Sequence, residues 1–495
     1  MKNPFRFLKR KKLVPPVPPM SLKERKEAFV SGHVGTTAFE VLLVSLSAPI
    51  GVACFQAVVS KLAPNNNKPF KILLEALLIW IPMIVCQTNL LYPYGISILT
   101  IQSLIAWLLF KFPTKPSEST STIISSSTKR ANQRLEYLTM YRSSLLYLTF
   151  IAILAVDFQL FPRRFAKTEV SGYGFMDIGA ASFVFSAGLV SPKARKSSPD
   201  TSFSIQRQLF HAIPLFLMGI LRLVTNKGLE YQEHVSEYGV HWNFFFTLGV
   251  VTLVTALTYS VVPKPTWLLP LGLMIGYQIV LSTLGVQTYI QEAPRTCVVY
   301  DHWLCHGFAA NREGIWGCVG YLVIYWFGEV IAYSFLWNPS PGRISLLQLA
   351  CWSWIFHWNW TIIWLVPVSR RSTNSSFCTW TVAHNVLLLG VFQAVGRNTM
   401  PNETPTKHSA LPIVMDTVNQ YGLSMFIIAN LLTGLVNLSF PTLDVTDGHA
   451  LMILFGYLCL VGLAAMVLSV VYPLLMPSKN KVLVGKDDTS KTKES

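Results

Sequence analysis

Apolar residues in this chain form long runs that short polar loops separate. About thirteen of these runs are roughly 17 to 25 residues long, the length that an α-helix needs to cross a bilayer. Their approximate centres are Leu46, Leu78, Ile101, Ile151, Phe183, Phe216, Val251, Ile275, Val323, Trp360, Leu388, Ile428 and Leu460. The pattern predicts an all-α polytopic integral membrane protein with about thirteen transmembrane helices.

Polar segments divide the chain into a spanning region and two tails. We assign residues 1–37 to a basic, proline-rich N-terminal tail, residues 38–476 to the multi-span domain, and residues 477–495 to a charged C-terminal tail. Within the domain, the Ser/Thr-rich stretch 112–142 is typical of a flexible cytosolic linker. Composition agrees with this division, because 52% of the 495 residues are hydrophobic and only 13% are charged.

The net charge of +16 indicates orientation and not nucleic-acid binding. Lysine and arginine are spread over many short loops, whereas a nucleic-acid site would gather them on one face. One set of alternate loops is richer in basic residues and shares a side with the C-terminal tail, so the positive-inside rule predicts a cytosolic C terminus and a lumenal N terminus. The basic run Lys9 to Lys12 opposes this orientation, but many loops outweigh one tail.

The last five residues, KTKES, place lysines three and five positions from the end. This pattern is similar to a cytosolic retrieval signal for the endoplasmic reticulum, which COPI-type machinery would bind. A solvated charged tail is the alternative. Elsewhere, Cys297 and Cys305 share one predicted lumenal loop and could form a disulfide, which the sequence does not decide.

The first unusual polar loop is VDFQLFPRRFAKTE, residues 156–169. Asp157 ends an apolar run, where an isolated carboxylate costs a few kcal/mol. Lys167 follows ten residues later, past a turn that could bring it back over the aspartate. The pair could close a helix end, or burial could tune Asp157 as a general base. Asp177 is a second acid in this region, and the small residues around it favour a structural role.

The second loop is LEYQEHVSEYGVHWNFFF, residues 229–246. If this segment is helical, Glu230, His234, Glu237 and His241 form one polar stripe. Two imidazoles and a carboxylate could bind a transition metal, but this spacing is weaker than H-E-x-x-H. We therefore favour a polyol or phosphate site and expect no metal.

The third loop, residues 297–315, contains Asn311, Arg312 and Glu313. Arg312 could bind phosphate oxygens with its two-pronged guanidinium group. Alternatively, it could be a snorkelling side chain capped by its neighbours. Further along, Asn430 and Asn437 lie seven residues apart on one helix face, and hydrogen bonds between helices explain them.

Five segments in this order resemble the GPI inositol-acyltransferase family of fungi and mammals: FPRRFAKTE, MDIGAASFVFSAG, LEYQEHVSEYGVHWNFF, ANREGI and ANLLTGLVNLS. The resemblance runs from about Leu145 to Ser439. It implies an endoplasmic reticulum protein that transfers a fatty acyl group, usually palmitoyl, from acyl-CoA to the inositol 2-hydroxyl of glucosaminyl-phosphatidylinositol. No permanently bound cofactor is implied.

The resemblance also implies a catalytic pair, which corresponds here to Asp157 and Lys167. Asp157 would accept the inositol proton. Lys167 would either orient that carboxylate or stabilise the oxyanion, and the sequence leaves both roles open. From residue type alone, Arg163 and Arg164 could bind the phosphates of the lipid or of CoA, and the stripe from Glu230 to His241 could contact the sugars.

Two questions remain open at this level. The motif loops fall on the predicted lumenal side, whereas acyl-CoA is made in the cytosol, so either CoA enters a deep cavity from the cytosolic side or the sidedness is reversed. A polar-lipid transporter or a non-catalytic subunit of a membrane complex would also carry many spans and buried acids. Internal inverted repeats, which would indicate a transporter, are not apparent.

Overall fold

A computed structural model describes residues 25–26, 28–29, 31–62, 67–111, 135–195, 205–228, 235–262, 264–297, 302–337, 343–399 and 411–475. Within these ranges the chain is helical, and its single β-bridge joins Thr36 to Tyr173. The first half contains α2 (Ala38–Leu62), α3 (Lys68–Glu75), α4 (Ile81–Cys86), α5 (Ile96–Lys111), α6 (Glu136–Ala155), α7 (Phe175–Leu189), α8 (Pro192–Arg195), α9 (Ile205–Gly228) and α10 (Val235–Tyr238). The second half contains α11 (Phe244–Val261), α12 (Leu268–Thr283), α13 (Val286–Glu292), α14 (Trp303–Ala310), α15 (Arg312–Ile331), α16 (Leu346–Trp364), α17 (Ser375–Thr399), α18 (Ile413–Gln420), α19 (Gly422–Ser439) and α20 (Asp447–Leu475).

The prediction of a polytopic membrane protein is confirmed, whereas the count of thirteen spans is not. By length and composition, nine helical segments among the described residues could cross a membrane, and the pair α12 and α13, bent by 68°, could be a tenth. The predicted spans around Phe183 and Phe216 contain shorter apolar helices, and α16 around Trp360 does not meet these limits. Apolar runs therefore located the helices better than they counted the membrane crossings.

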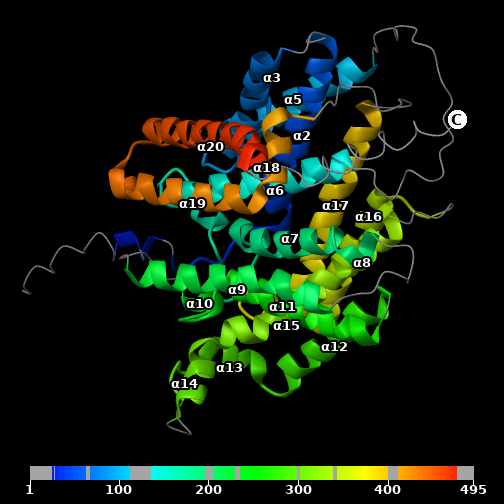
Figure 1. The fold of residues 1–495 in the computed structure, drawn as a ribbon, viewed down its shortest axis with the longest axis vertical. Coiled ribbons are helices and arrows are strands. Elements are labelled where there is room, and N and C mark those ends of the chain that lie inside the picture. The colour runs from blue at the N-terminus through cyan, green and yellow to red at the C-terminus, as the bar shows by residue number, and fades with distance from the viewer. Residues whose placement is uncertain are drawn as a thin grey trace, which may run out of the picture.

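Three helices form the centre of the bundle. The most apolar parts of α6, α15 and α17 are 83%, 78% and 72% buried, whereas that of α19 is 17% buried. Figure 1 shows that the chain passes from α2–α5 through α6 and α7 to α9–α14, and then returns through α15–α17 to α18–α20 beside the N-terminal helices. Helix α6 accordingly contacts helices from both ends of the chain.

Glycine permits the closest contact in this centre. A Cβ atom on Gly188 of α7 would lie 2.2 Å from the carbonyl oxygen of Tyr325, and one on Gly328 of α15 would lie 2.4 Å from that of Phe185. Any larger residue would force α7 and α15 apart. This contact fixes α7, whose first turn carries Asp177.

One predicted boundary changes in the structure. Helix α6 begins at Glu136, so residues 136–142 belong to this helix and not to the linker; the rest of the linker lies outside the described residues. Pro82 lies in α4 directly after a π-helical turn, η1 (Ala76–Trp80). A widened turn of this kind accommodates a residue that cannot donate a backbone hydrogen bond.

Candidate functional site

The polar loops meet at one end of the bundle. Thr36 N donates to Tyr173 O at 2.8 Å, Glu169 N donates to His33 O at 3.0 Å, and Gly172 N donates to Val368 O at 2.8 Å. The segment after α6 is thereby joined to the chain before α2 and to the loop before α17. The three loops that the sequence analysis singled out all reach this end, which is marked by α10 and α14 in Figure 1.

Asp157 lies just after the end of α6 and is only 8% exposed. Its Oδ2 accepts a hydrogen bond from Asn437 Nδ2 at 2.7 Å, and Asn437 Oδ1 accepts one from Lys26 Nζ at 3.1 Å. Burial raises the pKa of the Asp157 carboxyl, while the Asn437 amide and the charges of Lys26, Arg163 and Lys167 oppose that shift. The environment thus favours a carboxylate that takes up a proton more readily than an exposed aspartate.

Arg163 closes the end of α6. Its Nη2 donates to Val156 O and Phe158 O, both at 3.0 Å, its Nε donates to Phe161 O at 3.1 Å, and its guanidinium lies 3.7 Å from the centre of the Phe29 ring. Burial lowers its pKa to about 10. These contacts occupy most of the donors that a phosphate would need, so the structure favours a positioning role for Arg163 over substrate binding.

Arg164 is held by a carboxylate from another helix. Its Nε and Nη2 approach Glu40 Oε1 of α2 at 2.9 and 2.8 Å. Glu40 also accepts a hydrogen bond from Thr36 Oγ1. Arg164 therefore joins the FPRRFAK segment to α2, and its charge is already paired within the protein.

Lys167 forms an ion pair with Glu237 and not with Asp157. Arg370 extends this pair, because its Nη2 donates to Glu237 Oε2 at 3.2 Å and its Nη1 lies 3.6 Å from Asp177 Oδ1. Asp177 Oδ2 in turn accepts hydrogen bonds from the backbone N and the Oγ1 of Thr168, at 3.0 and 2.8 Å. Two acids and two cations from four parts of the chain make one charge-balanced set, which we call the lysine network (Lys167, Asp177, Glu237 and Arg370).

A cavity begins at the lysine network and continues between the helices. Lys167, Glu237, Tyr238 and Arg370 line its polar end. Most of the remaining wall is apolar; it includes Leu145, Leu148, Ala152 and Ile153 of α6, Ile178 and Phe183 of α7, and Phe426 of α19. Asp157 lies outside this lining, although it is close enough to Lys167 for their charges to interact. Such a cavity suits a ligand with a polar head and an apolar tail.

One buried histidine also lines this cavity. His384 of α17 is 1% exposed, and its Nδ1 has no hydrogen-bond partner among the residues that the structure describes. A buried ring nitrogen without a hydrogen-bond partner is costly, and a ligand in the cavity could supply one.

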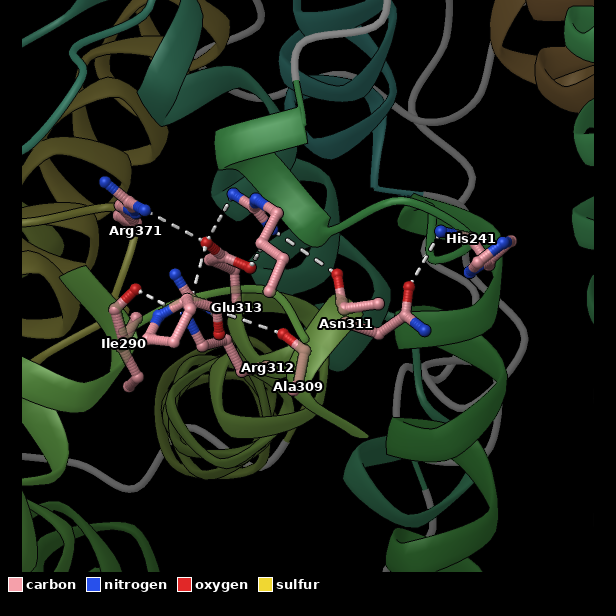
Figure 2. Close-up of polar contacts among 10 residues, drawn as sticks. His241, Ile290, Ala309, Asn311, Arg312, Glu313 and Arg371 are labelled. Atoms are coloured by element: carbon pink, nitrogen blue, oxygen red, sulfur yellow. Dashed lines mark hydrogen bonds and ion pairs between the residues drawn. The ribbon is translucent and has the colours of Figure 1, made fainter. Parts of the chain in front are cut away.

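The predicted helical stripe does not continue from Glu237 to His241. Glu230 and His234 lie outside the described residues. Helix α10 ends at Tyr238, and Gly239 follows with φ +110°, so Glu237 and His241 do not share a helix. His241 instead donates its backbone N–H to Asn311 Oδ1 at 2.7 Å (Figure 2).

Arg312, predicted to bind phosphate, is buried among protein acceptors. Figure 2 shows its Nε donating to Ile290 O at 3.0 Å and its Nη1 donating to Ala309 O at 3.3 Å. Glu313 beside it accepts hydrogen bonds from Arg295 and Arg371 at 2.9 and 3.1 Å. We call Arg295, Arg312, Glu313 and Arg371 the Glu313 cluster. The contacts favour the capped arginine over a phosphate contact, and the adjacent Cys297–Cys305 disulfide is formed.

Two residues of this site were not identified from the sequence. Asn437 was expected to make only an interhelical hydrogen bond, but it donates one to Asp157. Arg370 was not singled out, but it joins Asp177 to Glu237. A polar run, SRRSTNSS, does mark the Arg370 loop. Its partners lie more than 130 residues away along the chain, so local pattern could not identify them.

Comparison with known proteins places this geometry in a family. The sequence model of the GWT1 family matches residues 22–468. GPI-anchored wall transfer protein 1 of Aspergillus oryzae is 34% identical over 502 residues, which cover 90% of this chain and 98% of that protein. The proteins of the same name from Aspergillus fumigatus and Yarrowia lipolytica are 35% and 38% identical and cover 88% and 66% of this chain, and 95% and 71% of their own lengths.

Proposed function

Because the chain belongs to the GWT1 family, we propose that it acts in GPI-anchor biosynthesis as an O-acyltransferase of the endoplasmic reticulum membrane. The donor is acyl-CoA, with palmitoyl the expected chain, and the acceptor is the inositol 2-hydroxyl of glucosaminyl-phosphatidylinositol. The names of the relatives support the GPI connection, and the resemblance of the motifs suggests the reaction.

One observation carries the proposal: Lys167 lines the polar end of an otherwise largely apolar cavity, and the buried Asp157 carboxylate lies beside that lining, close enough to Lys167 for their charges to interact. Both substrates have apolar chains and polar reacting groups. Such a site could accommodate the chains in its apolar part and the reacting atoms near Lys167.

In the proposed reaction, the inositol hydroxyl oxygen attacks the thioester carbonyl carbon, and the Asp157 carboxylate accepts the hydroxyl proton. The C–O bond forms, and the tetrahedral intermediate carries the negative charge on the former carbonyl oxygen. Lys167, oriented by Glu237, is suited to stabilise that oxyanion; a preorganised donor in this role contributes about 2.7–4 kcal/mol. The C–S bond then breaks, and the CoA thiolate takes the proton from Asp157.

The proposed mechanism separates the two roles that the sequence left open for Lys167. A lysine that only oriented Asp157 would contact that carboxylate directly. Its ion pair with Glu237, on the cavity wall, favours oxyanion stabilisation.

The test is acyl transfer from labelled palmitoyl-CoA to glucosaminyl-phosphatidylinositol by the purified full-length protein. Asp157→Asn keeps the size of the side chain and removes the base, so we expect a loss of at least about a hundredfold in kcat. Asp444→Asn is the matched control, because Asp444 is an acid at the same end of the bundle whose 2.6 Å ion pair with Arg25 is exposed.

Near-normal transfer by folded Asp157→Asn would assign Asp157 a structural role, and Glu237, the carboxylate that lines the cavity, would be the next candidate base. An inactive wild-type protein, given both lipids, would instead return the transporter and the non-catalytic subunit as explanations.

A further inference from the structure

Three cations gather at the opposite end of α7 from the lysine network. Arg142 lies in the second turn of α6, and Lys193 and Arg195 belong to α8, which follows α7. Fifteen residues separate Arg142 from Asp157, which is about 22 Å along a helix. Figure 1 shows α8 and α10 at opposite ends of the bundle, so these cations are remote from the proposed chemistry.

Arg142 has no carboxylate partner among the described residues. Its Nε donates to Ser186 Oγ of α7 at 3.3 Å, and its terminal nitrogens have no hydrogen-bond partner in the described part of the chain. The charged group with which it interacts is another cation, Arg195. Two guanidinium groups held near each other without an intervening acid are unfavourable unless an anion binds between them.

Aromatic rings hold the other two cations in place. The Arg195 guanidinium lies 4.9 Å from the centre of the Trp337 ring, and Trp337 Nε1 donates to Leu189 O at 3.0 Å. Lys193 Nζ lies 5.1 Å from the centre of the Tyr259 ring. Contacts with ring faces orient a cation without using its hydrogen-bond donors, so those of the Arg195 guanidinium remain available to a ligand. Among the described residues, one buried acid, Glu329, interacts with Lys193, and the two arginines have no carboxylate partner.

The cations continue the wall of the cavity. Leu145 and Thr149 of α6 line the cavity, and Arg142 lies on the same helix face, one turn before Leu145. Ser182 of α7 also lines it, and Ser186, the partner of Arg142, follows by one turn. The hydrogen bond from Arg142 to Ser186 thus crosses between α6 and α7 where the cavity lining ends.

We propose that Arg142 and Arg195 form a binding site for the phosphate groups of acyl-CoA at the end of the cavity remote from Lys167, and that Lys193 adds positive charge beside it. The acyl thioester would then reach the lysine network through the space between α6 and α7. This inference rests on the proposed function. The proposed site would explain how cytosolic acyl-CoA serves a reaction on the predicted lumenal side. The phosphates would bind at the basic, predicted cytosolic end, while the thioester extends through the protein to the lysine network.

The test compares two thioester donors, palmitoyl-CoA and palmitoyl-pantetheine, which has no phosphate. In Arg195→Gln and in Arg142→Gln we expect KM for palmitoyl-CoA to rise about tenfold with kcat unchanged, because a charge-assisted contact to the donor is lost equally in the ground and transition states. KM for palmitoyl-pantetheine should not change. Arg195 is exposed, so its replacement also tests the site without disturbing the α6–α7 contact.

Lys111→Gln is the matched control. Lys111 is the last residue of α5, and its Nζ lies 4.8 Å from the centre of the Trp107 ring. The chain just before α5 lies at the end of the bundle that carries Asp157, because Asn89 N donates to Leu160 O. Lys111 is therefore an aromatic-stacked cation at the same end as Arg195 but away from the cavity. The proposal would be overturned if KM for palmitoyl-CoA were the same in Arg195→Gln and Lys111→Gln. It would also be overturned if Arg195→Gln raised KM equally for palmitoyl-CoA and palmitoyl-pantetheine.

Two further arms separate other outcomes. If Arg142→Gln and Arg195→Gln lose acyl transfer only in vesicles that contain anionic lipid, whichever donor is used, the cations bind a lipid phosphate. That result would overturn the CoA site. If wild type transfers no acyl group, the proposed function fails, and equilibrium binding of labelled CoA then tests the site by itself. Binding to Arg195→Gln about tenfold weaker than to wild type would support the CoA site. Equal binding to the two proteins, or no binding to wild type, would contradict it.

Discussion

Two clusters of charged side chains lie close together in this protein, and they differ in what surrounds them. In the Glu313 cluster, one carboxylate is shared by Arg295 and Arg371, and Arg312 donates to backbone carbonyls (Figure 2). None of these residues lines the cavity. In the lysine network, two acids face two cations, and three of the four residues line it. Ion pairs with similar distances can therefore serve packing in one place and a ligand site in the other.

Two adjacent arginines in the loop before α17, Arg370 and Arg371, belong to different clusters. Arg370 joins the lysine network and Arg371 joins the Glu313 cluster. One short loop thus fixes both clusters relative to each other. Substitutions in the Glu313 cluster should therefore reduce mainly stability, and substitutions in the lysine network should reduce mainly activity.

The largest effect should come from Glu313→Gln. Glu313 is 1% exposed, and its replacement would leave Arg295 and Arg371 without their shared carboxylate. Breaking one buried ion pair costs about 3–5 kcal/mol, so we expect a large fall in the thermal unfolding temperature and little folded protein. Wild-type-like melting of the detergent-solubilised variant would show that the cluster does not stabilise the fold.

The sequence predicted the elements better than their pairings. The apolar runs located the helices, and Asp157 does follow directly after α6, because hydrophobic length is a local property. The predicted stripe stops before His241 because Gly239, with φ +110°, turns the chain after α10. A Cβ atom there would also lie 2.5 Å from Asn311 Cα, so contact with a distant loop fixes this turn.

The candidate site was predicted only in part for a related physical reason. Lys167 and Asp157 are near enough to interact, but the direct partner of each comes from elsewhere: Glu237 for the lysine and Asn437 for the aspartate. Which loops meet depends on how the helices pack, and the pattern within one loop does not contain that information. Arg163, Arg164 and Arg312 looked like phosphate ligands because charge alone does not reveal that Glu40 and backbone carbonyls occupy them.

A smaller effect, and a more specific one, is expected from Arg370→Gln. The change leaves Glu237 and Asp177 without their shared cation, so the Lys167 ammonium is no longer held as in the native network. We expect kcat per folded molecule to fall about 10- to 100-fold, since misplaced positioning groups have effects of this size. Acyl transfer normalised to folded protein, measured by size-exclusion chromatography, gives the value.

Arg371→Gln is the paired control for that change. Arg371 donates to Glu313, which keeps its two hydrogen bonds from Arg295, so stability should fall modestly while kcat per folded molecule stays within about twofold. Equal kinetic losses in Arg370→Gln and Arg371→Gln would mean that the two clusters act as one unit, and the distinction between them would be lost.

Among the substitutions expected to impair transfer, Asn437→Ala should have the smallest effect, and the direction of its pH shift tests the role of Asp157. The Asn437 amide donates to Asp157 Oδ2 and stabilises the carboxylate, so its removal should raise the already raised pKa of Asp157 further. Only the deprotonated form can accept the inositol proton. The acidic limb of the kcat/KM profile should therefore move to higher pH, with a few-fold loss at neutral pH that is recovered in more alkaline buffer.

Stability supplies an independent check on that shift. A carboxyl group whose pKa is higher in the folded than in the unfolded state stabilises the fold at acidic pH, and this contribution is lost as pH rises. Asp157→Asn should therefore not unfold at a lower temperature than wild type at neutral pH, although we expect it to lower kcat at least about a hundredfold. If Asn437→Ala leaves the acidic limb in place or moves it to lower pH, Asp157 is not the group whose titration controls the reaction, and the base must be sought within the lysine network at Glu237.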